Sequence, residues 1–116
     1  MGQWSDWHPL DEETIDDYAS DESGVYKIKL IGEYYYEYPK KRSQIIYIGQ
    51  STERTILIRL KEHISGNNGN KKVYAYYEKY KLKFCEMCSD SPYDTEQNAL
   101  DRFFEEHGDI PICNER

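Results

Sequence analysis

Two β-prone runs, each containing one tyrosine and one glycine, limit most strongly how this chain can fold. In residues 24–30 (GVYKIKL) the apolar side chains Tyr26, Ile28 and Leu30 recur at every second position, the period of a β-strand. Residues 44–49 (QIIYIG) form a second run that stops at a glycine, and the charged link between the runs has the composition of a hairpin tip. We therefore expect two neighbouring strands.

Downstream patterns predict helices and one more strand. Residues 51–65 form a candidate helix, capped by Ser51 or Thr52, with an apolar stripe made of Ile56, Leu57, Leu60 and Ile64. Residues 79–87 (KYKLKFCEM) are β-prone, and residues 73–78 before them are helical or irregular. A last helix is expected to be capped by Asp94 or Thr95, to end at Gly108, and to face inward with Ala99, Leu100, Phe103 and Phe104.

This order of elements predicts a small α/β (α+β) sandwich, in which a three-stranded, mostly antiparallel sheet is flanked by helices. Charge divides its 116 residues into an acidic leader, residues 1–23, and one domain, residues 24–116. The leader has eight acidic residues and no Lys or Arg, a net charge of −8, whereas the rest has 15 basic and 14 acidic residues, a net charge of +1. Residues 9–19 would form a short helix, and Trp4 and Trp7 would pin the leader to the body.

Composition also indicates a compartment. No run of 18 apolar residues is present, so no membrane span is expected, and the first ten residues lack the pattern of a signal peptide. The three cysteines are odd in number and sparse, which favours free thiols in a reducing compartment. We therefore expect a cytoplasmic protein.

Several residues carry possible chemistry, although each has an ordinary structural alternative. Arg59 and His63 are four residues apart on the candidate helix, so they share a face that would bind a phosphodiester or would simply be solvated. Glu96, near the start of the last helix, would bind a divalent cation, or its charge would only interact favourably with the helix dipole. Tyr26 and Tyr47 would orient or deprotonate a water molecule, or pack in the core.

A basic cluster stands in the predicted hairpin tip. Lys40, Lys41 and Arg42 follow three consecutive tyrosines, residues 34–36. Such a cluster would hold a nucleic-acid backbone while the rings stack on bases. A charged hairpin tip that prevents edge-to-edge aggregation is an equally good interpretation.

Taken together, five elements in this order resemble the GIY-YIG nuclease family over residues 24–114. The two tripeptides that name the family appear as Gly24-Val25-Tyr26 and Tyr47-Ile48-Gly49. The later elements are Arg59 followed by His63, then Glu96 at the start of a helix, then the closing Asn114. Arg54 competes for the arginine position, but Arg59 alone has a histidine four residues later.

The resemblance implies a role for each matching residue. Tyr26 would be the general base or would position the attacking water, with Tyr47 beside it, and His63 would transfer protons or orient Tyr26. Arg59 would hold the scissile phosphate, and Glu96 would bind a single Mg²⁺ or Mn²⁺ ion. Asn114 would shape the pocket. The expected substrate-binding positions are Gly24, Gly49, Gln50, Ser51, Lys40, Lys41, Arg42 and Asn114.

The resemblance thus implies a metal-dependent endonuclease that hydrolyses phosphodiester bonds in DNA. A protein partner or a homodimer would supply its specificity. The alternatives are a non-catalytic module that binds nucleic acid on the same scaffold, and an interaction protein whose acidic leader engages a basic partner. Deleting residues 1–22 is expected to abolish such partner binding while nuclease activity persists or rises.

Overall fold

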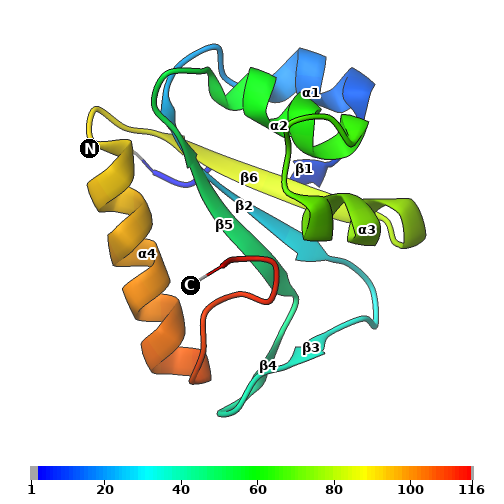
Figure 1. Ribbon diagram of the computed structural model, residues 1–116, viewed down its shortest axis with the longest axis vertical. Coiled ribbons are helices and arrows are strands. Elements are labelled where there is room, and N and C mark those ends of the chain that lie inside the picture. Colours follow the sequence, from blue (N-terminus) through cyan, green and yellow to red (C-terminus); the bar gives the residue numbers. More distant parts are fainter. Residues whose placement is uncertain (1–2, 116) are drawn as a thin grey trace.

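A four-stranded antiparallel sheet forms the centre of the fold, with the strand order β1-β6-β2-β5. The structure is a computed structural model, and it describes residues 3–115. Figure 1 shows the sheet with helices on both sides. In chain order the elements are β1 (His8–Pro9), α1 (Glu12–Tyr18), β2 (Gly24–Leu30), β3 (Tyr36–Glu37), β4 (Arg42–Ser43), β5 (Ile45–Ser51), α2 (Ile56–Ser65), α3 (Lys71–Lys79), β6 (Leu82–Cys88) and α4 (Pro92–His107).

The expected α+β architecture is confirmed, but the sheet has one strand more than the three predicted. The extra strand, β1, is two residues long and pairs with the outer edge of β6, where His8 lies opposite Phe84. Two residues cannot display an alternating pattern, so the sequence held no signal for this strand. The predicted hairpin tip forms a separate ribbon of β3 and β4, and Pro39 lies in the turn between them.

The two faces of the sheet carry different cores. On one face, Tyr26 and Ile28 pack with the buried residues of α1, α2 and α3, among them Ile15, Leu60 and Val73. On the other face α4 covers β5, and its inward residues form a smaller core with the sheet, made of Tyr38, Ile48 and Phe103 with Tyr36, Ile45, Ala99 and Leu100 against it. The tyrosine of β2 is therefore enclosed by the face that three helices cover.

Residues of the acidic leader are part of this packing. Leu10 and Ile15 are buried in the main core, at 4% and 0% exposure. The indoles of Trp4 and Trp7 pack against Lys27 and Lys29, whose ammonium nitrogens lie 4.1 and 4.4 Å from the ring centres. These contacts agree with the predicted pinning role of the two tryptophans.

The first helix, expected over residues 9–19, spans only Glu12–Tyr18 because Pro9 belongs to β1, and three details of α2 and α4 also differ from the predictions. The N-cap of α2 is Thr55, whose hydroxyl accepts a hydrogen bond from the N–H of Ile58 at 3.2 Å, because β5 runs on through Ser51 and keeps that residue extended. The N-cap of α4 is Ser91, because Pro92 occupies the first turn and starts the helix early. Phe104 is 44% exposed, since the inward stripe of α4 continues from Phe103 instead.

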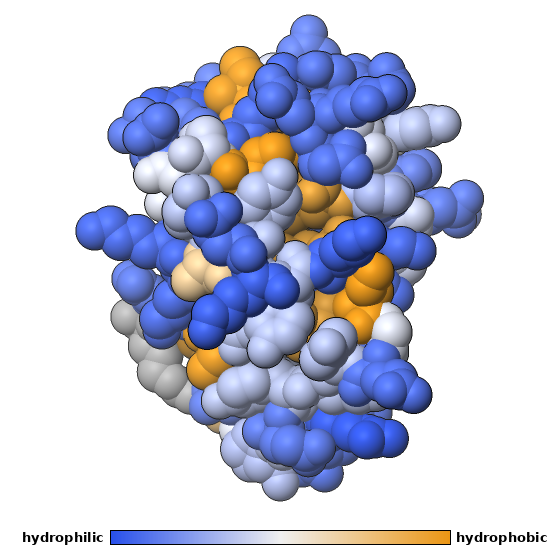
Figure 2. Space-filling view, turned by 90° about the vertical axis from the view of Figure 1, so that its right-hand side faces the viewer, coloured by the Kyte–Doolittle hydropathy of each residue, from blue (hydrophilic) through white to orange (hydrophobic). Residues whose placement is uncertain are grey.

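The surface is mainly polar. In Figure 2, hydrophilic side chains cover most of the face in view, and apolar residues appear as patches among them. Among residues 3–115 no helix combines the length and apolarity needed to cross a membrane.

Candidate active site

Tyr26 is at the centre of the candidate site. It is fully buried on β2, opposite Gly49 of β5, and its ring centre lies 6.1 Å from that of Tyr47. A Cβ atom at Gly49 would lie 2.6 Å from the Tyr47 ring and 2.8 Å from the Tyr26 hydroxyl oxygen. Only glycine therefore lets the two phenol rings approach the β5 backbone this closely.

His63 hydrogen-bonds to the Tyr26 hydroxyl from α2. The distance from His63 Nε2 to Tyr26 Oη is 2.8 Å, and His63 Nδ1 accepts the backbone N–H of Asn70 at 2.9 Å. Burial, reinforced by the charge of Arg59, lowers the pKa of His63 to about 3, so the ring is neutral near pH 7. A neutral ring that accepts at Nδ1 carries its proton on Nε2, so His63 donates to Tyr26.

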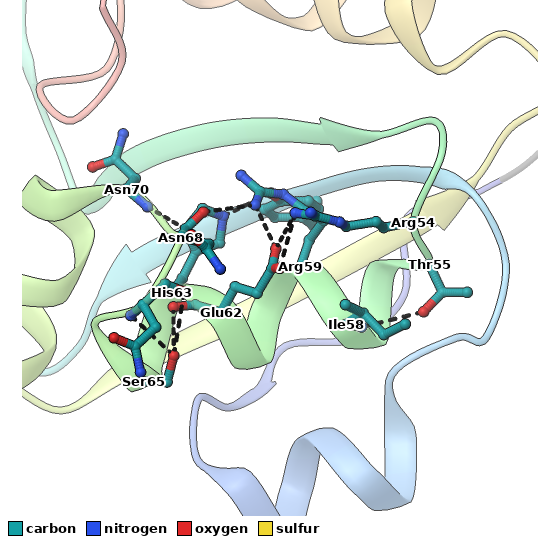
Figure 3. Close-up of polar contacts among 11 residues, drawn as sticks. Arg54, Thr55, Ile58, Arg59, Glu62, His63, Ser65, Asn68 and Asn70 are labelled. Atoms are coloured by element: carbon teal, nitrogen blue, oxygen red, sulfur yellow. Dashed lines mark hydrogen bonds and ion pairs between the residues drawn. The ribbon is translucent and has the colours of Figure 1, made fainter.

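The side chain of Arg59 lies close enough to Tyr26 and Tyr47 for its charge to act on both phenols. Its Nη1 donates to Glu62 Oε1 at 2.5 Å and to the Asn68 carbonyl oxygen at 3.1 Å. Arg54 reaches the same carboxylate at 2.9–3.0 Å, so Figure 3 shows two arginines converging on Glu62. The arrangement holds a half-exposed and a largely buried guanidinium in one polar cluster.

Both phenols are neutral at physiological pH. Burial raises the pKa of Tyr26 well above its usual value, and Tyr47 adds to this, whereas the charge of Arg59 acts against it. The pKa of Tyr47 is also raised by burial and lowered in part by Arg59. Forming a phenolate at this site thus depends on nearby positive charge.

Glu96 approaches the tyrosines from α4. Its negative charge lies close enough to raise the pKa of both Tyr26 and Tyr47, and burial raises the pKa of Glu96 itself. The side-chain amide of Gln97 donates a hydrogen bond to the Glu96 carboxylate at 3.5 Å. No group of three or more acidic, histidine or cysteine ligands occurs among the described residues, so a cation here would have one carboxylate ligand and would fill its shell with water and phosphate oxygens. That donor set suits Mg²⁺ or Mn²⁺.

Asn114 fastens the C-terminal tail to β5. Its side-chain oxygen accepts the N–H of Ile48 at 3.0 Å, and its amide nitrogen donates to the Ile48 carbonyl at 2.8 Å. Gly24 is tightly enclosed, since a Cβ there would lie 2.3 Å from the Met87 carbonyl oxygen. Both residues thus fix the backbone beside the tyrosine pair.

The remaining predicted substrate-binding residues lie in two places. Gln50 and Ser51 line a pocket beside Arg59. Lys40 donates to the Glu105 carbonyl at 2.9 Å, Lys41 pairs with Glu106 at 3.7 Å, and Arg42 stacks on Tyr35. The basic cluster therefore contacts the end of α4 and Tyr35. Gln50 and Ser51 instead line the pocket beside Arg59.

A second, larger cavity shares Thr52 with the pocket beside Arg59 but is lined by other side chains. It has a volume of about 1230 Å³ and is lined by residues such as Trp4, Lys27 and Arg102, but by none of the tyrosine, arginine, histidine and glutamate side chains of the site. The pocket beside Arg59 is smaller, about 450 Å³. Proximity to the titratable groups, more than size, makes the smaller pocket the relevant one.

Sequence reasoning missed Glu62, Gly69 and Asn70. A Cβ at Gly69 would lie 2.6 Å from the His63 Cα, so this glycine lets the loop after α2 fold against the helix. Asn70 then reaches His63 with its backbone, caps α3 through Val73, and donates its side-chain amide to the Cys113 carbonyl. The only signal for this role was the run GNNGN, residues 66–70, which predicts a loop but not its contacts.

The site thus joins two phenols, a neutral imidazole, a guanidinium and a carboxylate from β2, β5, α2 and α4. Comparisons of the chain with protein-family models, curated proteins and solved structures find no match. The geometry and chemistry of these side chains therefore carry the functional argument.

Proposed function

We propose that this protein is a GIY-YIG-type endonuclease that hydrolyses phosphodiester bonds in DNA with one bound Mg²⁺ or Mn²⁺ ion. The observation that carries the proposal is the convergence of Tyr26, Tyr47, Arg59, His63 and Glu96, which the sequence resemblance singled out, around one buried phenol. A carboxylate, a guanidinium and a proton acceptor are what an in-line displacement at phosphorus requires.

The hydrogen-bond directions support Tyr26 as the group that acts on the attacking water. His63 donates its Nε2 proton to Tyr26 Oη, and the backbone N–H of Asn70 occupies its other nitrogen. His63 therefore orients Tyr26 and would stabilise its phenolate, which forms when the hydroxyl proton is lost to solvent and which can then accept a proton from the attacking water. Arg59 favours the same charge and offers its fork to the non-bridging oxygens of the phosphate.

Glu96 would hold the divalent cation, which supplies positive charge for the leaving oxygen. The carboxylate suits this role because it is half-buried and, within residues 3–115, forms no ion pair. Tyr47 packs against both Tyr26 and His63, and would help to confine an attacking water beside Tyr26.

The cellular setting is part of the same proposal. Cys85, Cys88 and Cys113 are free thiols, which supports a reducing compartment such as the cytoplasm. The basic cluster, residues 40–42, would add backbone contacts to DNA, and a second copy or a protein partner would supply sequence or structure specificity.

The decisive experiment is cleavage of a panel of labelled single-stranded, duplex and branched DNAs by the wild type and by Glu96→Ala. Metal-dependent cleavage is expected for the wild type and is expected to fall at least about a hundredfold in the variant, since the carboxylate is the proposed protein ligand. Glu105→Ala, which removes an exposed carboxylate from the same helix, is the matched control.

The alternative outcome is equally clear. If neither protein cuts any substrate with Mg²⁺ or Mn²⁺, yet both bind DNA with equal affinity, the endonuclease proposal is wrong and the scaffold is a nucleic-acid-binding module. If the wild type neither cuts nor binds DNA, an interaction with another protein becomes the function to test.

A further inference from the structure

The pocket beside Arg59 has features that the proposed cleavage chemistry does not use. It has a volume of about 450 Å³ and lies where β5 ends and α2 begins. Arg59 is one of its walls, so the pocket adjoins the position proposed for the scissile phosphate. Its six lining residues are Gln50, Ser51, Thr52, Glu53, Arg54 and Arg59.

Ser51 is the first indication of a ligand. Its side chain is only 3% exposed, and within residues 3–115 its hydroxyl oxygen has no hydrogen-bond partner. A buried hydroxyl without a partner is costly, so in a folded protein such a group calls for a partner such as water, an ion or a bound ligand. Ser51 follows Gly49 by two residues on β5, so it extends along the strand face that carries the tyrosine site.

Arg54 is the second indication. Its side chain is 52% exposed, and it shares the Glu62 carboxylate with the less exposed Arg59. Two guanidinium groups on one carboxylate leave positive charge and several N–H donors for another anion. Glu53, an exposed residue at the same rim, is the acidic side chain among the six that opposes such an anion.

We propose that Arg54 and Ser51 bind a second phosphate of the cleaved strand, next to the phosphate that Arg59 holds. The proposal deepens the endonuclease function and rests on it for the identity of the strand. Arg54 would pair with a non-bridging oxygen, and the Ser51 hydroxyl would donate to the same phosphate. Because neither contact reads a base, the subsite sets the register of the strand without selecting a sequence.

The test measures binding without cleavage, so that it does not depend on catalysis. A labelled DNA oligonucleotide is titrated with protein in chelator over a range of salt concentrations. Arg54→Gln is expected to weaken binding about tenfold and to lower the slope of log affinity against log salt by about 0.7–0.9, the loss of one phosphate contact. Ser51→Ala is expected to weaken binding less and leave the slope unchanged, because it removes no charge.

Two further variants test the direction of the charge effect on DNA binding and the location of the phosphate subsite. Glu53→Gln is expected to strengthen binding, because it removes the opposing charge at the rim. Arg102→Gln, which removes an exposed arginine lining the cavity on the other face of the sheet, is expected to leave binding and slope unchanged. In cleavage assays, Arg54→Gln would raise KM with an unchanged single-turnover rate at saturating DNA.

The outcomes separate the two proposals. Wild-type affinity and slope in Arg54→Gln, together with metal-dependent cleavage, would overturn the subsite and leave the endonuclease standing. Weaker binding in Arg54→Gln without cleavage by any protein would support a phosphate site on a non-catalytic scaffold. The absence of both DNA binding and metal-dependent cleavage in the wild type would overturn both proposals.

Discussion

At the scale of single residues, the tautomer of His63 decides how the site works. A backbone N–H can only donate, so the contact from Asn70 to Nδ1 requires an unprotonated nitrogen there. The ring's other nitrogen consequently donates to Tyr26. His63 is therefore a fixed hydrogen-bond donor, and the Tyr26 hydroxyl oxygen is its acceptor.

The same residue makes stability depend on pH. The pKa of His63 is about 3 in the folded protein and near 6.5 when unfolded, so between these values only the unfolded state binds the proton. The contribution of His63 to the free energy of unfolding is therefore full above about pH 6.5. Below that pH it falls by up to about 1.4 kcal/mol per pH unit. Urea unfolding of the wild type and of His63→Gln should show a stability gap that narrows as the pH falls; a constant gap would contradict the buried neutral imidazole.

Gly49 permits a second prediction at this scale. In Gly49→Ala the new methyl group would overlap the Tyr47 ring and the Tyr26 hydroxyl, so both phenols must move. Overpacking of this kind costs about 1–3 kcal/mol, which leaves most domains folded. Cleavage should fall far more than DNA binding. Gly32→Ala is the control for lost stability: its φ of 69° strains alanine, but no atom lies within 4 Å of the new methyl, so it should be destabilised yet retain cleavage.

At the scale of elements, the loop between α2 and α3 holds the imidazole in place. Gly69 allows the loop to touch the backbone of α2, and Asn70 uses this closeness to bond His63 and to cap α3. A short connection therefore couples the end of one helix to the start of the next and to the Tyr26 hydroxyl.

Gly69→Ala tests that coupling. The added Cβ would come within 2.5–2.6 Å of Glu62 and His63 backbone atoms, which cannot rotate away, so the loop must shift. We expect a loss of about 1–3 kcal/mol in the free energy of unfolding and an upward shift of the His63 pKa, observable by NMR titration. Asn67→Ala, an exposed substitution in the same loop, should change neither quantity.

Elements with a strong local pattern were predictable, whereas contacts between elements were not. Alternation identified β2, and helical spacing identified the stripe of Ile56 and Leu60 on α2. The spacing of Arg59 and His63 correctly placed them a turn apart, but it could not show that His63 is fully buried. That burial depends on how the loop at Gly69 folds, which residue spacing does not encode.

At the scale of the whole molecule, the acidic leader is a structural part of the domain. Leu10 and Ile15 belong to its main core, and backbone N–H groups of Ile56 and Leu57 donate to the carbonyls of Glu22 and Ser20. The segment thus also closes the first turn of α2, next to Arg59.

Deleting residues 1–22 should therefore destabilise the fold as well as remove charge. Losing two buried aliphatic side chains costs about 3–6 kcal/mol, a large share of the roughly 5–15 kcal/mol that stabilises a domain. Thermal unfolding should show a strongly lowered Tm, contrary to the expectation that activity persists; an unchanged Tm would contradict the packing. Neutralising the exposed Glu12, Glu13 and Asp17 instead tests the charge while keeping the core.

The two ends of the described chain also protect the sheet from self-association. An outermost strand with unpaired backbone groups is a template on which another molecule can add a strand. Here β1 and Ser5 bond to β6, while Cys113 and Asn114 take up N–H and carbonyl groups of β5 at Ile46 and Ile48 (Figure 1). Proteolytic trimming at either end is therefore expected to expose unpaired backbone groups of an edge strand and to promote aggregation.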